Sequence, residues 1–165
     1  MAKQLIVLFA LVAIASAGMK IGNGGLDLLK FSEGWRADYY IDQIGLKTIG
    51  YGHACVWHNN CNDIGKTPLT QQQGVDLLKK DLVEYENCVN NAVSGLNQNQ
   101  FDACVDFTFN MGCQAFQTSD ILKNIKAKNW QGAANAFSKY NVAAGQVIEG
   151  LTVRRANDKK LFLKK

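Results

Sequence analysis

Residues 31–53 read FSEGWRADYYIDQIGLKTIGYGH, and this run decides how the chain folds because it holds a helix end and two strands. The apolar residues just before it predict a short helix. Gly34 is expected to end that helix, since glycine tolerates the left-handed conformation found at helix ends. Strand-forming residues follow at 37–41 and 46–49, separated by a glycine-containing turn. The sequence therefore predicts a helix that runs directly into a β-hairpin.

Two carboxylates and a hydroxyl lie in this run: Glu33 on the last helical turn, Asp42 at the hairpin bend and Thr48 on the second strand. The carbonyl end of a helix carries partial negative charge, which favours the protonated form of Glu33. Asp42 is expected to be open to water and ionised. A proton donor, an ionised carboxylate and a hydroxyl that can hold a water are the groups needed to hydrolyse a glycosidic bond.

The same run resembles the phage-type lysozymes of glycoside hydrolase family 24. The matching residues are Glu33-Gly34, Tyr40-Ile41-Asp42 and Thr48-Ile49-Gly50-Tyr51-Gly52-His53. Two later parts of the chain resemble further family blocks: residues 96–103 with 107–112, and residues 140–145 with 150–155. The last block departs from the family at Tyr140 for Trp, Ala144 for Gly and Asp158 for Glu. Since alanine adopts a positive φ at a cost that glycine avoids, Ala144 could alter its loop.

The resemblance implies an α+β, lysozyme-like fold, with a small β-hairpin lobe around residues 36–62 and a larger helical lobe from about residue 90. The active-site cleft would lie between them. It also implies hydrolysis of the β-1,4 bond between N-acetylmuramic acid and N-acetylglucosamine in peptidoglycan. The resemblance suggests inversion at the sugar if a water fits between the carboxylates and the sugar, and the sequence leaves retention open. Glu33 would be the general acid. Asp42 would stabilise positive charge on the sugar, and Thr48 would help Asp42 to hold the attacking water.

Relatives suggest that Phe109 and Asn110 contact the substrate. A buried core Phe and a helix-ending Asn are equally compatible with the sequence at these positions. Arg154 and Arg155 could reach a carboxylate in the cleft, but a solvent-exposed helix face is the more ordinary expectation.

Residues 1–17 have the features of a secretory signal peptide: a basic start, an apolar run and Ala15-Ser16-Ala17 before the expected cleavage point. We therefore expect residues 18–165 to be one secreted catalytic domain, acting outside the cell or in a lytic or digestive vacuole. A phage enzyme that retains this segment as a releasable membrane anchor is an alternative. Host defence, digestion and phage lysis all fit the sequence.

The chain has five cysteines, an odd number that fits an oxidising compartment with one free thiol. Cys55 and Cys61 flank a short loop and make the simplest pair. Cys104 lies in an apolar helical stripe and is expected to be a buried free thiol. By elimination, Cys88 pairs with Cys113.

Two histidines, His53 and His58, lie among the first cysteines and raise the question of zinc. The spacing is not that of a common zinc finger, and secreted thiols usually oxidise, so we predict no metal and no cofactor. For His53 we expect a structural role, and the resemblance suggests Asp81 as its non-catalytic partner.

The formal net charge is +4 at pH 7, with no basic block interleaved with aromatics that would indicate nucleic-acid binding. We expect a monomer that binds cell-wall peptidoglycan, without nucleic acid or stable membrane association. Two rival functions remain: a non-hydrolytic wall-binding protein, and an enzyme of the same mechanism acting on chitin or a related polymer.

Further along the chain, side chains that can cap helices precede several apolar periodic segments. Thr70 with Gln73, and Asn97 with Gln100, have the spacing of capping boxes. Ser119 or Thr118 is expected to cap the next helix. The final periodic segment, with Trp130, Ala133, Ala134 and Phe137, is expected to pack in the core.

Overall fold

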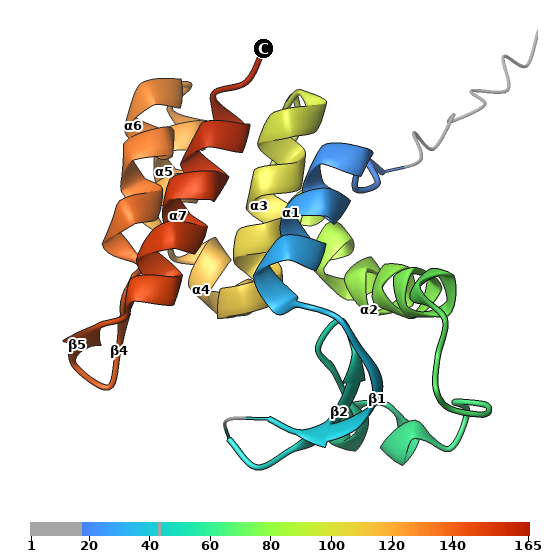
Figure 1. The fold of residues 1–165 in the computed structure, drawn as a ribbon. Coiled ribbons are helices and arrows are strands. Elements are labelled where there is room, and N and C mark those ends of the chain that lie inside the picture. The colour runs from blue at the N-terminus through green and yellow to red at the C-terminus, as the bar shows by residue number, and fades with distance from the viewer. Residues whose placement is uncertain (1–17, 43) are drawn as a thin grey trace, which may run out of the picture.

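The computed structural model describes residues 18–42 and 44–165, so the signal-peptide prediction for residues 1–17 lies outside the described residues. No helix in these two ranges is long and apolar enough to cross a membrane. Figure 1 shows a group of helices on one side and a small sheet on the other, with the long helix α2 alongside both. This is the expected α+β arrangement of two lobes.

The smaller lobe is built from short elements. In chain order they are β1 (Arg36–Ile41), β2 (Lys47–Gly50), β3 (His53–Ala54), the 3₁₀ turn η1 (Cys55–Trp57) and the 3₁₀ turn η2 (Asn59–Cys61). β2 pairs antiparallel with both β1 and β3. The predicted hairpin is therefore confirmed, whereas β3 is too short for its sequence pattern to have indicated it.

The larger lobe consists mostly of helices. Its elements are α1 (Asn23–Glu33), α2 (Gln71–Ala92), α3 (Gln98–Met111), α4 (Cys113–Gln117), α5 (Asp120–Lys126), α6 (Trp130–Ala136), η3 (Phe137–Lys139), β4 (Val142–Ala143), β5 (Gln146–Val147) and α7 (Glu149–Phe162). Gly34 ends α1 with φ 72°, as expected.

The predicted caps form. Both capping boxes are complete, at Thr70 before α2 and at Asn97 before α3. Ser119, rather than Thr118, caps α5 by accepting a hydrogen bond from the backbone N–H of Leu122 at 3.0 Å. These local hydrogen bonds explain why the sequence placed the helix starts correctly.

Helix α3 lies at the centre of the larger lobe, between α1 and α7 (Figure 1). It contacts α1, α2, α4 and α7, and every residue from Phe101 to Thr108 is buried.

One prediction for the core is wrong. Trp130 is 38% exposed, because it begins α6 and lies at the rim of the apolar stripe, whereas Ala133, Ala134 and Phe137 are buried.

The disulfide predictions are confirmed. Cys55 bonds to Cys61 within the small lobe, and Cys88 bonds to Cys113, joining α2 to α4. Cys104 is a buried free thiol on α3. Burial raises the pKa of this thiol, so it is held in its neutral form.

The small lobe is fixed to α2 by close packing. Trp35 lies so near Gly74 that a Cβ at position 74 would come within 2.0 Å of the indole ring. The Leu69 N–H also donates a hydrogen bond to the Ala37 carbonyl at 2.8 Å. This packing fixes the sheet, and the groups it carries, relative to the helices.

Residues 142–147 form a small β4–β5 hairpin that the sequence did not predict, because each strand has only two residues. At its tip Ala144 has φ 49° and Gly145 has φ 78°. The substituted alanine therefore adopts the left-handed conformation that glycine adopts more easily. The loop forms with this local strain.

Candidate active site

Glu33 lies where three separate parts of the chain meet. It is the last residue of α1, and its Oε1 accepts a hydrogen bond from Nη1 of Arg154 on α7 at 2.7 Å. Its other oxygen, Oε2, faces the turn between β2 and β3, where a Cβ at Gly52 would come within 3.0 Å. A side chain at position 52 would crowd this carboxylate, so the close approach requires glycine.

Arg154 corrects the expectation of a solvent-exposed helix face. The side chain is buried, and its Nε and Nη2 donate to Asp106 Oδ2 and Oδ1 at 2.9 and 3.0 Å. Burial lowers the pKa of Arg154, but the charges of Asp106 and Glu33 outweigh burial and raise it. Arg154 thus keeps its positive charge beside Glu33. The sequence alone indicated only the partial negative charge at the carbonyl end of α1, and the Arg154 charge has the opposite sign.

Arg155 is also buried, which overturns the expected exposed position. Its Nε lies 2.9 Å from Asp158 Oδ2, and its Nη2 lies 3.8 Å from Asp106 Oδ2. Burial raises the pKa of Asp158, and the neighbouring Asp106 raises it further. The two arginines therefore join α7 to α3 through buried ion pairs, and Glu33 lies at the more open end of this cluster.

Asp42 closes the turn between β1 and β2. Its Oδ1 accepts hydrogen bonds from the N–H groups of Ile44 and Leu46 at 3.0 and 2.8 Å. The residue is half-buried. The turn therefore holds Asp42 by one carboxylate oxygen at the end of the hairpin, as the sequence predicted.

Thr48 lies in the middle of the sheet and is only 2% exposed. Its hydroxyl donates to the Leu46 carbonyl at 3.1 Å, which leaves the hydroxyl oxygen able to accept a hydrogen bond from water.

Thr48 is paired with Tyr40 across β1 and β2. Burial raises the pKa of Tyr40, and the charges of Glu33 and then Asp42 raise it further, so both carboxylates lie within electrostatic range of this tyrosine.

A cavity of about 200 Å³ opens beside Glu33, between the small lobe and the helices. It is lined by Glu33, Gly52, Ala54, Trp57, His58, Asp81, Tyr85, Phe109 and Asn110. The structure therefore brings Phe109 and Asn110 to the same cavity as Glu33. Phe109 packs edge-on against Tyr85, with ring centroids 5.1 Å apart. The Oδ1 atom of Asn110 is buried without a hydrogen-bond partner among the described residues, so it is free to accept one from a bound molecule.

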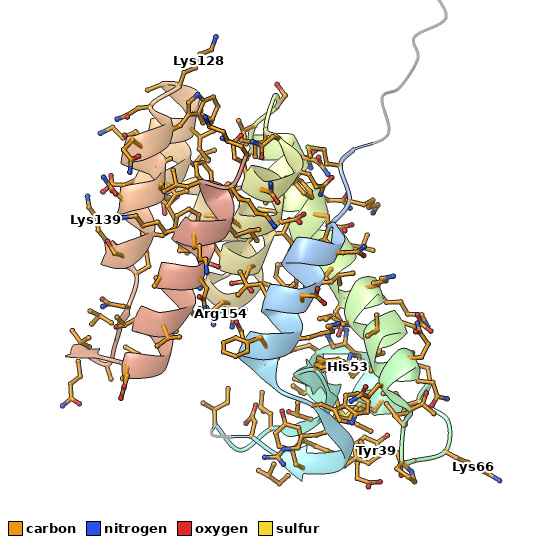
Figure 2. The ribbon with its side chains drawn as sticks, turned by 45° about the horizontal axis from the view of Figure 1, so that its top comes forward. Tyr39, His53, Lys66, Lys128, Lys139 and Arg154 are labelled. Carbon is orange, nitrogen blue, oxygen red and sulfur yellow. A yellow bond between two sulfur atoms is a disulfide. The ribbon has the colours of Figure 1, made fainter. Side chains whose placement is uncertain are left out.

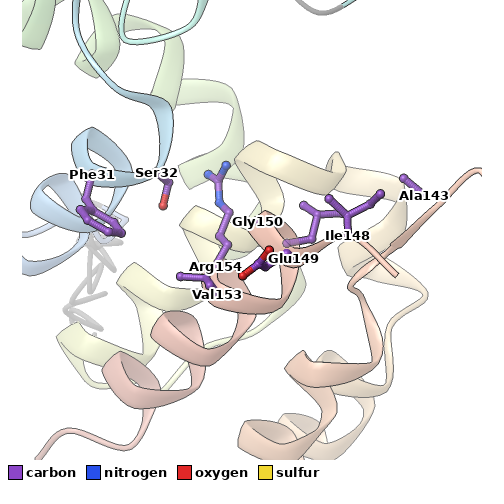
Figure 3. Close-up of a pocket in the computed structure, with 9 residues that line it drawn as sticks. Phe31, Ser32, Ala143, Ile148, Glu149, Gly150, Val153 and Arg154 are labelled. Atoms are coloured by element: carbon purple, nitrogen blue, oxygen red, sulfur yellow. The ribbon is translucent and has the colours of Figure 1, made fainter. Parts of the chain in front are cut away.

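A larger cavity of about 750 Å³ is lined in part by Arg154 (Figure 3). Phe31 and Ser32 from the end of α1 line one wall, and Ile148, Glu149 and the start of α7 line the opposite wall. Arg154 extends from α7 toward Ser32 in this view. Each member of the ion pair therefore borders a cavity, Glu33 the smaller one and Arg154 the larger one.

His53, His58 and Asp81 come together, with their ligand atoms within 4.8 Å of one another. Figure 2 shows His53 in the small lobe. The Nδ1 atoms of the two histidines lie 2.8 and 3.7 Å from the two Asp81 oxygens. The imidazole rings stack, with centroids 4.2 Å apart and planes inclined by 23°. A metal bound by both rings would have to lie in both ring planes, which such stacking prevents. The cluster is therefore suited to a structural hydrogen-bonded role, and the predicted pairing of His53 with Asp81 is confirmed.

Three residues at the site were missed or misjudged from the sequence. Asp106 and Arg154 are 48 residues apart in the chain, and nothing in their spacing indicates a contact. The third is Trp57, whose place in the sequence could have indicated a surface position. It lies in a short loop between two cysteines and has polar neighbours, which is unusual for a core tryptophan.

Comparison with known proteins gives consistent matches. The family model described as phage lysozyme matches residues 30–158. The endolysin of Salmonella phage P22 is 38% identical over 146 residues, covering 88% of this chain and 99% of that protein. A solved structure of P22 lysozyme covers the same shares of both chains, with a TM-score of 0.78. The muramidase domain of SpmX from Asticaccaulis excentricus is 36% identical, with a TM-score of 0.76 over 88% of this chain and 99% of that domain.

Proposed function

The chain belongs to the phage lysozyme family, and from that premise we infer how its site carries out the muramidase reaction, the hydrolysis of peptidoglycan. The observation that carries the proposal is Glu33, which lines the 200 Å³ cavity at the junction of the lobes and is bound by Arg154, a residue that lines the 750 Å³ cavity. The bond that is cleaved is the β-1,4 bond between N-acetylmuramic acid and N-acetylglucosamine.

Glu33 is the general acid in this proposal. Arg154 binds Oε1 and fixes the carboxyl group, so the proton for the leaving oxygen is carried on Oε2, the atom that faces Gly52. A fixed donor needs no reorientation at the moment of transfer, which lowers the barrier. Substrate binding displaces water from the cavity and brings the leaving oxygen to this atom.

Asp42 stabilises the positive charge that develops on the sugar ring, and it positions the attacking water together with Thr48. Their supporting contacts are the turn hydrogen bonds to Asp42 Oδ1 and the available lone pair on the Thr48 hydroxyl. Attack by a water held on the hairpin side, opposite the donor, inverts the configuration at the sugar. The reaction requires neither a metal nor an organic cofactor.

Phe109 and Asn110 bind the substrate. The Phe109 ring offers an apolar surface to a sugar, and the unpartnered Oδ1 of Asn110 accepts a hydrogen bond from the N–H of an N-acetyl group. This contact distinguishes N-acetylated sugars from plain glucose polymers, because a buried acceptor left unsatisfied is costly.

The test compares the native protein with Glu33→Gln, which keeps the shape of the side chain but cannot donate the proton. Clearing of a cell-wall suspension and formation of reducing ends should both fall to background in Glu33→Gln, while wall binding persists. Asp27→Asn, an exposed carboxylate on the same helix, is the matched control and should keep full activity. Binding without hydrolysis by the native protein would instead support a wall-binding protein.

A parallel assay on chitin oligomers addresses the closest rival substrate. Faster release of reducing ends from peptidoglycan than from chitin is expected. The reverse order would reassign the substrate to an N-acetylglucosamine polymer.

We also propose that residues 18–165 form the mature, monomeric, secreted enzyme. Sequencing the N-terminus of the exported protein should give Gly18 as the first residue, and retention of residues 1–17 would favour a membrane-anchored form. Size-exclusion chromatography with light scattering tests the monomer.

A further inference from the structure

We propose that Trp57 and the surface beyond it form an outer saccharide-binding subsite, which extends the cleft away from Glu33 along α2. This inference rests on the proposed function, since the ligand is a longer part of the same glycan. It assigns a binding role to a loop that the reaction itself does not use.

The position of Trp57 is the first observation. The indole is 69% exposed, an unusual state for the largest apolar side chain. It nevertheless lines the 200 Å³ cavity that contains Glu33. Trp57, His58 and Asp81 also line a second cavity of about 540 Å³, together with Lys80, Val83, Glu84 and Asn87 of α2. The indole therefore lies at the junction of the two cavities, where a polymer leaving the Glu33 cavity in this direction must pass.

The rigidity of the loop is the second observation. The disulfide between Cys55 and Cys61 closes the loop on either side of Trp57, and both cysteines are buried. Asn59, Asn60 and Cys61 all have positive φ values, of 49°, 51° and 60°. Three consecutive non-glycine residues in this region store backbone strain, which persists only where the surrounding structure imposes it. The loop thus carries Trp57 on a preformed backbone, so little backbone entropy is lost on binding.

The chemistry of the surface identifies the ligand as a saccharide. A pyranose ring has a face of C–H groups that packs well on an aromatic ring, while its edge carries hydroxyl and N-acetyl groups. Beyond Trp57 the second cavity offers an ammonium at Lys80, a carboxylate at Glu84 and an amide at Asn87. These exposed donors and acceptors can hydrogen-bond to the hydroxyl and N-acetyl groups at the edge of a sugar.

The test uses peptide-free glycan fragments of peptidoglycan, a tetrasaccharide and an octasaccharide, with Trp57→Ala and Trp57→Phe. For Trp57→Ala, kcat/KM on the octasaccharide should fall about tenfold, mainly through a higher KM, and kcat/KM on the tetrasaccharide should fall by a clearly smaller factor. Trp57→Phe keeps an aromatic face and should recover most of the loss. Trp130→Ala removes a partly exposed tryptophan on the distant α6 and should behave as the native protein. Equal losses on both fragments, or no loss on the octasaccharide, would overturn the outer subsite.

Binding is measured separately from catalysis by titrating Glu33→Gln with the octasaccharide and recording tryptophan fluorescence. The fluorescence change should be largely lost in Glu33→Gln combined with Trp57→Ala, and Kd, measured for both proteins by isothermal titration calorimetry, should rise about tenfold. An unchanged Kd would refute the subsite whether or not the native protein hydrolyses the glycan. Conversely, a catalytically silent native protein that shows the Trp57-dependent binding would refute the muramidase mechanism and leave the subsite intact.

Discussion

Replacing Arg154 by Gln should destabilise the protein strongly, because it removes a buried charge that has two carboxylate partners. Asp106 is fully buried and is bound by two donors of Arg154, at 2.9 and 3.0 Å. Two unit charges about 4 Å apart interact by about 4 kcal/mol at an effective dielectric constant of about 20. Removing one partner of a buried pair costs about 3–5 kcal/mol, since the other charge loses its hydrogen-bonded partner. Arg155 stays 3.8 Å from Asp106 and compensates it only in part. Glu33 adds less, because it is more exposed.

The assay is urea unfolding followed by circular dichroism, with Lys160→Gln as the control for removing an exposed positive charge from the same helix. We expect Arg154→Gln to lower the free energy of unfolding by about 4 kcal/mol, equivalent to a drop in Tm of about 10 °C for a domain of this size. Lys160→Gln should change it by less than about 0.5 kcal/mol.

A second variant separates charge from packing. Arg154→Met combined with Asp106→Leu removes both buried charges and should be more stable than Arg154→Gln. A loss below about 1 kcal/mol in Arg154→Gln, or a double variant less stable than the single one, would refute the reasoning that the lost partner of Asp106 dominates the cost.

Three further outcomes are expected. Asp158→Asn imitates the protonated acid that burial favours. Because the pKa of Asp158 is raised in the fold, its stabilising contribution is full below the ordinary value of 3.8 and is lost as pH rises through the folded-state pKa. Unfolding free energies measured across pH should therefore show the native protein losing stability relative to Asp158→Asn as pH rises, and the opposite slope would contradict the assignment. Ala144→Gly relieves a positive φ and should stabilise the protein by about 0.5–1 kcal/mol in thermal unfolding; destabilisation would contradict the left-handed turn. Cys104 should not react with a thiol reagent in the native protein, and one thiol per chain should react after unfolding without reductant. Rapid labelling of the folded protein would show that the thiol is accessible.

The sequence determined the features that depend on neighbouring residues. The end of α1 at Gly34, the hairpin that carries Asp42, and the caps at Thr70 and Asn97 were all predicted, because each is set by hydrogen bonds and backbone preferences within a few residues. The cysteine count gave the correct pairs for a similar reason, since one pair lies within a short loop and the free thiol lies in an apolar stripe.

The short strands escaped prediction. β3, β4 and β5 have two residues each, too few for any alternation of apolar and polar side chains. Trp130 was predicted to be buried but is partly exposed. Helical spacing identifies the apolar face of a helix, but it does not show which end of that face reaches the surface.

Only the tertiary structure decided what surrounds Glu33. Its partner Arg154 is 121 residues away in the chain, and Arg154 in turn depends on Asp106 of the central helix α3. The position of Trp57 beside the Glu33 cavity likewise depends on how the small lobe packs on α2. Sequence spacing reports local backbone geometry, whereas the charge beside a carboxylate and the walls of a cavity come from segments that meet only when the core assembles.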